Sequence, residues 1–322
     1  MDPKVSIILP IYNGEKKLQN SLDSLLNQSY SNFELIACID GTSDGSERIL
    51  RDANDRRITI INNPLNMGLG RTLNRLIAYS NPKADYIAIA EQDDWYYPYR
   101  IEKQVELLDL NENVGLVSGI AEFYNGEKVL GKFPGMLANG KQYPSDPKEM
   151  IKLNYRMGPK VQQTCMMFRK KVHVDNGLYF TQHFHTLHTD WVYILRFALV
   201  SEIKGLHLPL VMKDRSNDRI SATKNNLKMY HGSKELIKSM FWEMPGILTQ
   251  EDFKYALNTK ILEEGRTMGN FIFIIKFFEA LFNHPSDPRI RTYIKTIKRK
   301  LFSKIKPPHF NSSSGKKNLF NV

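Results

Sequence analysis

The chain has 322 residues, of which 42% are apolar and 25% charged, a balance that is typical of a globular protein and excludes a disordered one. The net charge of +11 is uneven, because residues 291–322 hold nine Lys or Arg and no Asp or Glu, which leaves +2 on the first 290 residues. We therefore expect no nucleic-acid groove in the body, and contact of the basic tail with an anionic surface.

The cysteines, the N-terminus and the longest apolar run indicate in which cellular compartment the protein is expected. The two cysteines, Cys38 and Cys165, lie in apolar runs and are too few for a disulfide framework, which favours a reducing compartment. No secretory signal is evident at the N-terminus. The longest apolar run, residues 271–282, is far shorter than the roughly 20 residues of a spanning helix. We expect a cytoplasmic protein, or one peripheral on the inner face of the cell membrane.

Short apolar runs alternate with amphipathic ones along the first half of the chain. The expected strands are Val5–Leu9, Phe33–Ile39, Ile58–Ile61, Tyr86–Ala90 and Leu116–Phe123. The expected helices between them are Lys16–Leu26, Ser46–Asp55, Arg71–Tyr79 and Tyr99–Leu110. This alternation predicts an α/β fold with a mainly parallel central sheet, and the first four strands are apolar enough to be buried on both faces.

The second half is less regular. Residues Gly126–Tyr143 are rich in Gly, Pro and Lys and predict a flexible loop. Strands are expected at Thr164–Phe168 and Leu206–Met212, with a helix at Trp191–Val200 between them. We predict an α/β domain over 1–223, a helical C-terminal region over 224–306 and a disordered basic tail over 307–322.

Each of the first four predicted strands ends in polar residues. They are Pro10, Tyr12 and Asn13; the run Asp40–Ser46; Asn66, Gly68 and Arg71; and Glu91, Gln92, Asp93 and Asp94. Because ligands of open parallel sheets bind at the carboxyl ends of the strands, these clusters predict one binding site.

The carboxylates of Glu91, Asp93 and Asp94 would repel one another without a cation. Such hard oxygen ligands suit Mg²⁺ or Mn²⁺ bound together with a diphosphate. A solvated acidic turn that caps the next helix is the alternative, and the three neighbouring clusters favour the metal. Asp40 can read a base or ribose or simply form a turn, and Tyr12 can stack on a base or be structural.

The ordered motifs resemble those of family 2 glycosyltransferases. They are Val5–Gly14, Asp40–Ser46, Asn66-x-Gly68, Glu91–Asp94 and Pro98-x-Arg100-Ile101-x-Lys103-Gln104, and the resemblance covers roughly residues 4–221. It implies a GT-A fold over 1–223 and inverting, metal-dependent transfer from a nucleotide-diphosphate sugar, a UDP-sugar being favoured, to a hydroxyl of a glycan or lipid-linked acceptor in surface polysaccharide synthesis.

The resemblance also assigns roles to residues. Asp190 matches the catalytic base, and Asp93 with Glu91 matches the site of Mn²⁺ or Mg²⁺. The predicted donor-binding residues are Pro10, Tyr12, Asn13, Asp40, Asn66, Gly68, Arg71 and Gln92.

Four positions depart from the family pattern. This chain has Glu91 where the family has Asp, and Thr189 where the family has a Glu before the base. It has Leu73 where an Arg is common, and Asn217 where a His near the metal is common. They motivate an alternative, a catalytically inactive nucleotide-sugar-binding or glycan-binding relative that acts as a membrane-associated scaffold. The joint presence of Asp40, Asp93 and Asp190 favours the enzyme.

A histidine cluster precedes the predicted base. His183, His185 and His188 could bind zinc, but their spacing fits no common zinc site. Acceptor binding and a plain polar loop are therefore favoured over a zinc site. We name His185, His188 and Trp191 as acceptor candidates.

The last predicted helix, within residues 291–306, alternates apolar and basic residues. That pattern indicates either an interfacial membrane helix or an amphipathic helix packed on the body.

Two other enzyme classes fit poorly. A phosphatase of the haloacid-dehalogenase type needs a nucleophilic Asp where Cys38 stands, and a dinucleotide oxidoreductase needs a glycine-rich turn that residues 10–14 do not supply.

Overall fold

The computed structural model describes residues 4–182, 188–215, 226–267, 270–290 and 294. The chain forms two compact units, Met1–Lys260 and Ile261–Val322. The boundary predicted between residues 223 and 224 and the tail predicted over 307–322 lie outside the described residues.

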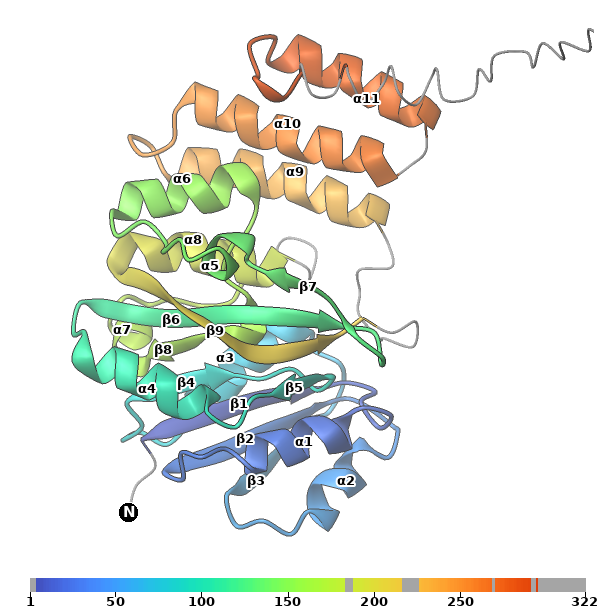
Figure 1. The fold of residues 1–322 in the computed structure, drawn as a ribbon. Coiled ribbons are helices and arrows are strands. Elements are labelled where there is room, and N and C mark those ends of the chain that lie inside the picture. Colours follow the sequence, from blue (N-terminus) through green and yellow to red (C-terminus); the bar gives the residue numbers. More distant parts are fainter. Residues whose placement is uncertain (1–3, 183–187, 216–225, 268–269, 291–293, 295–322) are drawn as a thin grey trace, which may run out of the picture. The chain divides into compact units, whose positions relative to one another are not determined.

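The first unit is built on a mixed sheet with the strand order β3-β2-β1-β4-β8-β6-β9-β5, and β7 pairs with β6 (Figure 1). The strands are β1 (Val5–Ile11), β2 (Phe33–Asp40), β3 (Ile58–Asn63), β4 (Tyr86–Ile89), β5 (Asp94–Tyr96), β6 (Val114–Tyr124), β7 (Val129–Phe133), β8 (Met167–Arg169) and β9 (Glu202–Asp214). The first four run parallel, β8 is antiparallel to both β4 and β6, and β9 is again parallel to β6. The predicted α/β fold with a mainly parallel sheet is confirmed.

Helices cover both faces of this sheet. The helices that lie wholly in the first unit are α1 (Leu18–Leu26), α2 (Ser46–Asp52), α3 (Leu69–Tyr79), α4 (Arg100–Leu110), α5 (Gly135–Ala138), α6 (Pro147–Met157), α7 (Lys170–Asp175), α8 (Thr189–Val200) and α9 (Asn226–Glu243). Helix α10 (Gln250–Thr267) begins in the first unit and ends in the second. Side chains from α1, α2 and α4 share one apolar core, whereas α3, α6, α8 and α9 share the other. Because successive side chains of a strand alternate, Ile7 and Leu9 join the first core and Ile8 joins the second.

The edge strand β3 differs from the prediction. Thr59 and Asn62 are exposed, so the expectation that this strand is buried on both faces is wrong. Its only hydrogen-bonded strand neighbour among the described residues is β2, and an edge position leaves part of its surface in solvent.

The predicted flexible loop at Gly126–Tyr143 is also corrected. It contains β7, whose Phe133 pairs with Ala121 of β6, followed by the short helix α5. Val129 and Leu130 of β7 are exposed, so the strand has no alternating apolar pattern that could reveal it. Pairing with β6, and not local sequence, creates this strand.

Local signals define α6. The Asp146 side chain accepts a hydrogen bond from the Glu149 N–H at 2.9 Å, and Pro147 occupies the first turn. Gly158, with φ of 73°, follows the last residue of the helix, where a left-handed conformation favours glycine.

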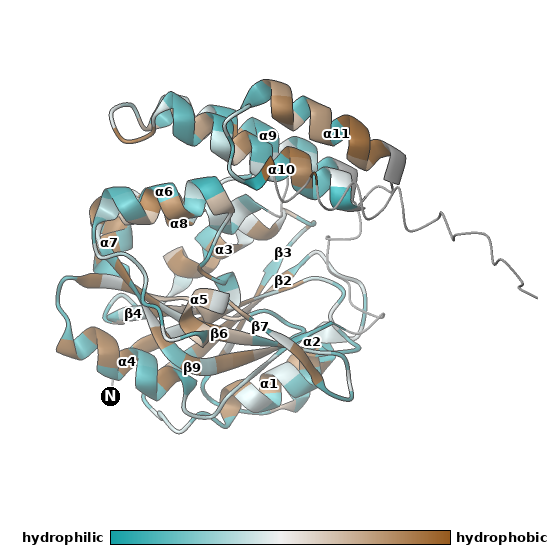
Figure 2. Cartoon of the chain, turned by 45° about the horizontal axis from the view of Figure 1, so that its top comes forward, coloured by the Kyte–Doolittle hydropathy of each residue, from teal (hydrophilic) through white to brown (hydrophobic). Residues whose placement is uncertain are grey.

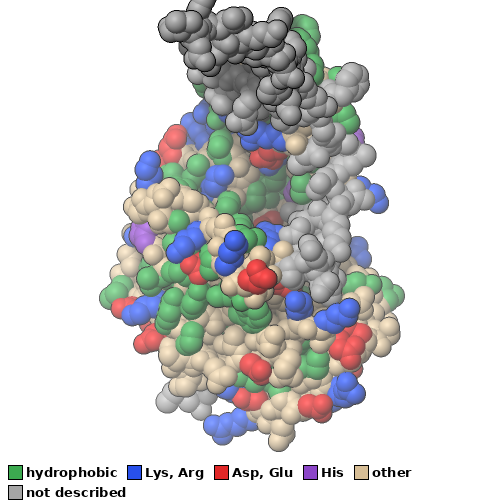
Figure 3. All heavy atoms as spheres, turned by 45° about the vertical axis from the view of Figure 1, so that its right-hand side comes forward, with side chains coloured by type: hydrophobic (Ala, Val, Ile, Leu, Met, Phe, Trp, Pro, Cys, Tyr) green, Lys and Arg blue, Asp and Glu red, His purple; other side chains and the backbone are tan. Residues whose placement is uncertain are grey.

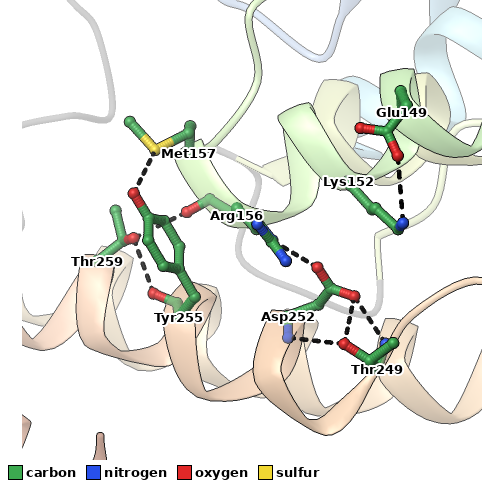
Figure 4. Close-up of polar contacts among 8 residues, drawn as sticks. All are labelled: Glu149, Lys152, Arg156, Met157, Thr249, Asp252, Tyr255 and Thr259. Atoms are coloured by element: carbon green, nitrogen blue, oxygen red, sulfur yellow. Dashed lines mark hydrogen bonds and ion pairs between the residues drawn. The ribbon is translucent and has the colours of Figure 1, made fainter. Parts of the chain in front are cut away.

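The start of α10 is tied to α6 through Asp252 (Figure 4). Thr249 donates from its backbone N–H and its hydroxyl to Asp252 Oδ2 at 2.8 and 2.7 Å, and the Asp252 N–H donates back to Thr249 Oγ1 at 3.2 Å. Arg156 of α6 forms an ion pair with the other oxygen of this buried carboxylate. Burial alone would raise the pKa of Asp252, but the bonds from Thr249 and Arg156 hold it below its usual value.

In the second unit, α11 (Asn270–Asn283) follows the last turns of α10. Lys276 of α11 lies 3.3 Å from Glu264 and 2.8 Å from Glu279, so its charge is balanced locally. No helix in the described ranges combines the length and apolarity needed to cross a membrane.

Candidate active site

The carboxyl ends of four parallel strands meet at one edge of the sheet. In the registers of these strands, Pro10 of β1 lies opposite Cys38 of β2, and Asp40 of β2 lies opposite Asn63 of β3. The loops that follow β1, β2, β3 and β4 therefore bring the four predicted polar clusters to the same edge, as parallel strands in this order require.

Gln92 ties the β4 loop to the β1 loop. Its side chain accepts from the Tyr12 N–H at 2.9 Å and donates to the Tyr12 carbonyl at 2.8 Å. A Cβ on Gly14 would lie 2.6 Å from the Gln92 side-chain oxygen, so a larger residue there would force the Gln92 side chain to move. The amide of Gln92 positions this loop, while Tyr12 remains 43% exposed.

The loop after β2 is organised by Asp44. Its carboxylate accepts from the backbone N–H groups of Glu15 at 3.0 Å and Ser46 at 3.1 Å, and Thr42 Oγ1 accepts from the Asn13 N–H at 3.2 Å. Burial would raise the pKa of Asp44, but the hydrogen bonds from Ser46 and Glu15 outweigh it and lower the pKa. Sequence reasoning missed Asp44 and Thr42 as loop organisers, although both are turn-forming residue types.

Asp40 is 4% exposed and already makes three hydrogen bonds. It accepts from Asn63 Nδ2 at 2.6 Å, from the Met67 N–H at 2.9 Å and from the Gly68 N–H at 3.0 Å. A carboxylate offers about four lone-pair directions, so roughly one remains for a ligand. Asp40 thus shapes the loop after β3 in addition to any contact that it makes with a donor.

The two glycines of this loop face another segment of the chain. At Gly68, where φ is +84°, a Cβ would lie 2.1 Å from Gln182 Nε2, and at Gly70 it would lie 3.0 Å from the Thr181 carbonyl oxygen. Among the described residues these glycines therefore make room for residues 181–182. Asn66 and Arg71, on either side of them, are exposed at the surface.

The acidic cluster lies after β4. One carboxylate oxygen from each of Glu91, Asp93 and Asp94 lies within 4.8 Å of the others. Lys213, near the end of β9, places its Nζ 2.7 Å from Glu91 Oε2 and 3.1 Å from Asp94 Oδ2. Asp93 forms no ion pair with a described residue. The spacing and the hard oxygen donors fit a divalent metal.

Burial and mutual repulsion set the protonation of the cluster. Desolvation, followed by repulsion from Glu91, raises the pKa of Asp93. For Asp94 desolvation raises the pKa to about 7 even though Lys213 opposes the shift. Desolvation alone would lower the pKa of Lys213, but the Asp94 and Glu91 carboxylates hold it well above its usual value. The ammonium is therefore charged.

A buried arginine supports the backbone of the cluster. Arg100 is fully buried, donates to the Ile89 carbonyl at 2.7 Å and stacks on the Tyr96 ring with its guanidinium 4.7 Å from the ring centre. The Tyr96 hydroxyl in turn contacts the backbone N and O of Glu91 at 2.6 and 3.0 Å. In the motif at Pro98–Gln104, Arg100 thus fixes the strand end from which the carboxylates project.

Asp190 occupies the first turn of α8 and accepts from the Trp191 N–H at 2.8 Å. Desolvation first, and then repulsion from Glu91, raise its pKa to about 7, while Lys213 opposes the shift. The electrostatic influence of Glu91 and Lys213 on Asp190 is in keeping with a place for the first turn of α8 near the acidic cluster. A carboxylate with a pKa near neutrality has the basicity that a general base needs.

The acceptor candidates are placed differently. His188 is 5% exposed, and its Nε2 lies 3.0 Å from the Met229 carbonyl oxygen and 3.1 Å from Ser233 Oγ. Trp191 is 1% exposed and donates from its indole N–H to the Asn154 carbonyl at 2.9 Å. Both side chains pack in the core, which does not favour their predicted acceptor contact. His185 lies outside the described residues.

The structure also shows where two of the residues that depart from the family pattern lie. Thr189 and Leu73 are buried, at 1% and 0% exposure, whereas Asn217 lies outside the described residues. Sequence reasoning missed Lys213, because a lone lysine at the end of an apolar strand gives no indication of which carboxylates it meets.

The sheet topology and the edge that carries the acidic cluster define a protein of the GT-A type. A crystal structure of S. aureus TarS has a similar fold, with a TM-score of 0.61 and 16% identity over 93% of this chain and 82% of that one. The mannosyltransferase PcManGT from Pyrobaculum calidifontis, in complex with GDP-Man and Mn²⁺, is similar with a TM-score of 0.55 and 13% identity over 95% and 89% of the two chains.

The sequence model of glycosyl transferase family 2 matches residues 6–176, so the chain belongs to this family. It is 37% identical over 151 residues to the putative glycosyltransferase EpsE of Bacillus subtilis, covering 44% of this chain and 54% of that protein. It is 32% identical over 132 residues to the UDP-Glc:alpha-D-GlcNAc-diphosphoundecaprenol beta-1,3-glucosyltransferase WfgD of Escherichia coli, covering 41% and 51%. The chain thus spans about half the length of these curated relatives.

Proposed function

We propose that this chain is an inverting glycosyltransferase that moves a sugar from a nucleotide-diphosphate donor to a hydroxyl group of a glycan or lipid-linked acceptor. The observation that carries the proposal is the cluster of Glu91, Asp93 and Asp94 carboxylates, whose oxygens lie within 4.8 Å of one another after β4. The raised pKa of Asp190, to which Glu91 contributes, supports this residue as the base. A base beside a metal-diphosphate site is the arrangement that direct displacement at a sugar carbon needs.

The donor would occupy the edge formed by the loops after β1, β2 and β3. The exposed ring of Tyr12 offers a stacking face for the base, and the remaining lone pair of Asp40 can accept from a base N–H or a ribose hydroxyl. Asn66 and Arg71 are exposed beside it, and Arg71 can meet the diphosphate. We favour UDP because TarS has also been crystallised with UDP and UDP-GlcNAc.

Asp93 and Glu91 would hold Mn²⁺ or Mg²⁺, which supplies positive charge against the leaving diphosphate. Asp190 takes the proton of the acceptor hydroxyl as its oxygen bonds to the anomeric carbon. The bond from that carbon to the diphosphate breaks on the opposite face, and the nucleotide leaves with the electron pair. One base suffices, because no covalent sugar–enzyme intermediate forms.

Thermal unfolding against UDP-, GDP-, CMP- and dTDP-sugars, with and without Mn²⁺, tests this site. A ligand at 100 times its dissociation constant adds about 2.7 kcal/mol of stability, which is measurable. We expect a metal-dependent shift with one donor that Asp93→Ala abolishes and that Glu106→Ala, an exposed acid of α4, leaves unchanged. No shift with any donor for the folded protein would contradict the assignment, and donor binding without turnover would support the inactive scaffold.

We also propose that the second unit contacts an anionic membrane surface. In α11, Ile275, Phe278 and Phe282 are 49%, 49% and 84% exposed at a helical spacing of three and four residues, and the helix is predominantly apolar (Figure 2). The chain beyond residue 290 supplies the nine basic residues. On the face drawn in Figure 3, basic and acidic side chains of the described residues are interspersed.

Co-sedimentation with phosphatidylcholine vesicles, with and without phosphatidylglycerol, tests this contact. Replacing both Phe278 and Phe282 by Ser should weaken binding to the anionic vesicles at least about tenfold, because burying each ring contributes roughly 1.5–3 kcal/mol. Trp242→Ser is the matched control, since Trp242 is 79% exposed but lies on α9 of the first unit. Equal losses for the two variants would contradict a contact through α11.

A further inference from the structure

Lys213 brings a positive charge into the acidic cluster by strand pairing. In the antiparallel pair of β5 and β9, Lys213 is the register partner of Asp94. Its side chain is only 14% exposed, and its Nζ contacts Glu91 as well as Asp94. The ammonium is therefore held in place at the site, because moving it away would require two strands to separate or a buried ion pair to open.

The three carboxylates do not share this cation equally. Lys213 lies within ion-pair distance of Glu91 at 2.7 Å and of Asp94 at 3.1 Å, whereas Asp93 has no ion pair with a described residue. A divalent ion that binds Asp93 and a free oxygen of Glu91 would thus lie close to a fixed ammonium. Like charges at such distances repel strongly in a poorly hydrated site.

Added negative charge would offset that repulsion. A diphosphate brings at least two negative charges and several oxygen ligands to the same place, so it favours the ion by attraction and by coordination. Without the diphosphate, Lys213 already neutralises part of the negative charge of the carboxylate cluster. A purely structural ion pair would hold β5 to β9 but would leave the affinity of the free protein for a cation independent of the charge at position 213.

We propose that Lys213 is a positioning residue that keeps divalent-cation affinity low in the free protein and makes tight cation binding depend on the diphosphate of the donor. The inference rests on the proposed function for the identity of the diphosphate. Through Lys213, near the end of β9, tight binding of the metal would follow binding of the nucleotide at the same site.

Titration with Mn²⁺, followed by the electron paramagnetic resonance signal of the free ion, measures this affinity without any turnover. Wild-type protein should bind Mn²⁺ weakly alone and at least tenfold more tightly with UDP or GDP, after correction for Mn²⁺ bound to free nucleotide. Lys213→Met should bind Mn²⁺ at least tenfold more tightly than wild type in the absence of nucleotide. Lys213→Arg, which keeps the charge, should behave as wild type.

Lys17→Met is the matched control. Lys17 lies 2.9 Å from the buried Asp214, the residue after Lys213, so this variant removes the same charge from a neighbouring ion pair outside the cluster. Its Mn²⁺ affinity should change much less than that of Lys213→Met.

Two results would overturn the inference. One is an unchanged Mn²⁺ affinity in folded Lys213→Met without nucleotide. The other is equal Mn²⁺ affinity of wild type with and without a nucleotide that calorimetry shows to be bound, which is measurable even if Lys213→Met does not fold. A separate outcome concerns the proposed function alone: if no nucleoside diphosphate or nucleotide-sugar binds wild type while Lys213→Met gains Mn²⁺ affinity, the donor site fails and the repulsive role of Lys213 stands.

Discussion

Asp190→Asn is expected to lower kcat by about 10³-fold, within the range of roughly 10²–10⁴ that a general base contributes, while the donor binds with nearly unchanged affinity. The amide has the shape of the carboxylate but cannot take the acceptor proton. Asp190 lies on α8, whereas the proposed donor residues follow β1, β2 and β3. Transfer assays with the donor found by thermal shift, together with donor titration by calorimetry, separate the two effects.

Glu149→Gln provides the control for this variant. Glu149 is an exposed acid in the first turn of α6, as Asp190 is in the first turn of α8, so both substitutions remove a negative charge from a helix N-terminus. The control should leave kcat unchanged. Retention of more than a tenth of wild-type kcat in Asp190→Asn would exclude Asp190 as the base.

Gly41→Ala should impair both stability and donor binding. The φ of Gly41 is +69°, and a Cβ there would lie 2.3 Å from Asn66 N and 2.4 Å from Leu65 C, both backbone atoms that cannot rotate away. A left-handed non-glycine residue costs about 1–2 kcal/mol, and overpacking adds about 1–3 kcal/mol. We expect a loss of about 3 kcal/mol in the free energy of unfolding and at least tenfold weaker donor binding, because the loop of Asn66 must shift.

Gly140→Ala separates the collision from the backbone strain. Its φ of +75° is similar, but no atom lies within 4 Å of the Cβ position among the described residues. Urea unfolding should show a loss of about 1–2 kcal/mol for this control, and donor binding should not change. Equal losses in the two variants, with intact donor binding in Gly41→Ala, would show that the contact with the Asn66 loop does not matter.

The parallel half of the sheet was predictable because burial leaves a strong local pattern. Continuous apolar runs such as Val5–Leu9 occur where a strand is covered on both faces, and Ile7 and Ile8 of β1 indeed join opposite cores. Strand β7 was not predictable, since its exposed Val129 and Leu130 carry no periodic signal and its hydrogen bonds come from β6. Edge positions weaken the pattern in the same way at β3.

Part of the candidate site could also be predicted from the sequence. The acidic residues Glu91, Asp93 and Asp94 are neighbours in sequence, and topology places the loops of Tyr12 and Asp40 beside them. The burial of His188 and Trp191 was not readable, because apolar and polar contacts from α6 and α9 determine it.

The sequence by itself determined the fold class, the family and the residues that crowd the sheet edge, because each depends on local patterns and on the order of the strands. Only the tertiary structure showed which partners those residues meet. Lys213 and Glu91 are 122 positions apart, and the pairing of β9 with β5 brings a cation among the carboxylates. Long-range pairing of this kind depends on the packing of the whole sheet, and no local signal in the chain encodes it.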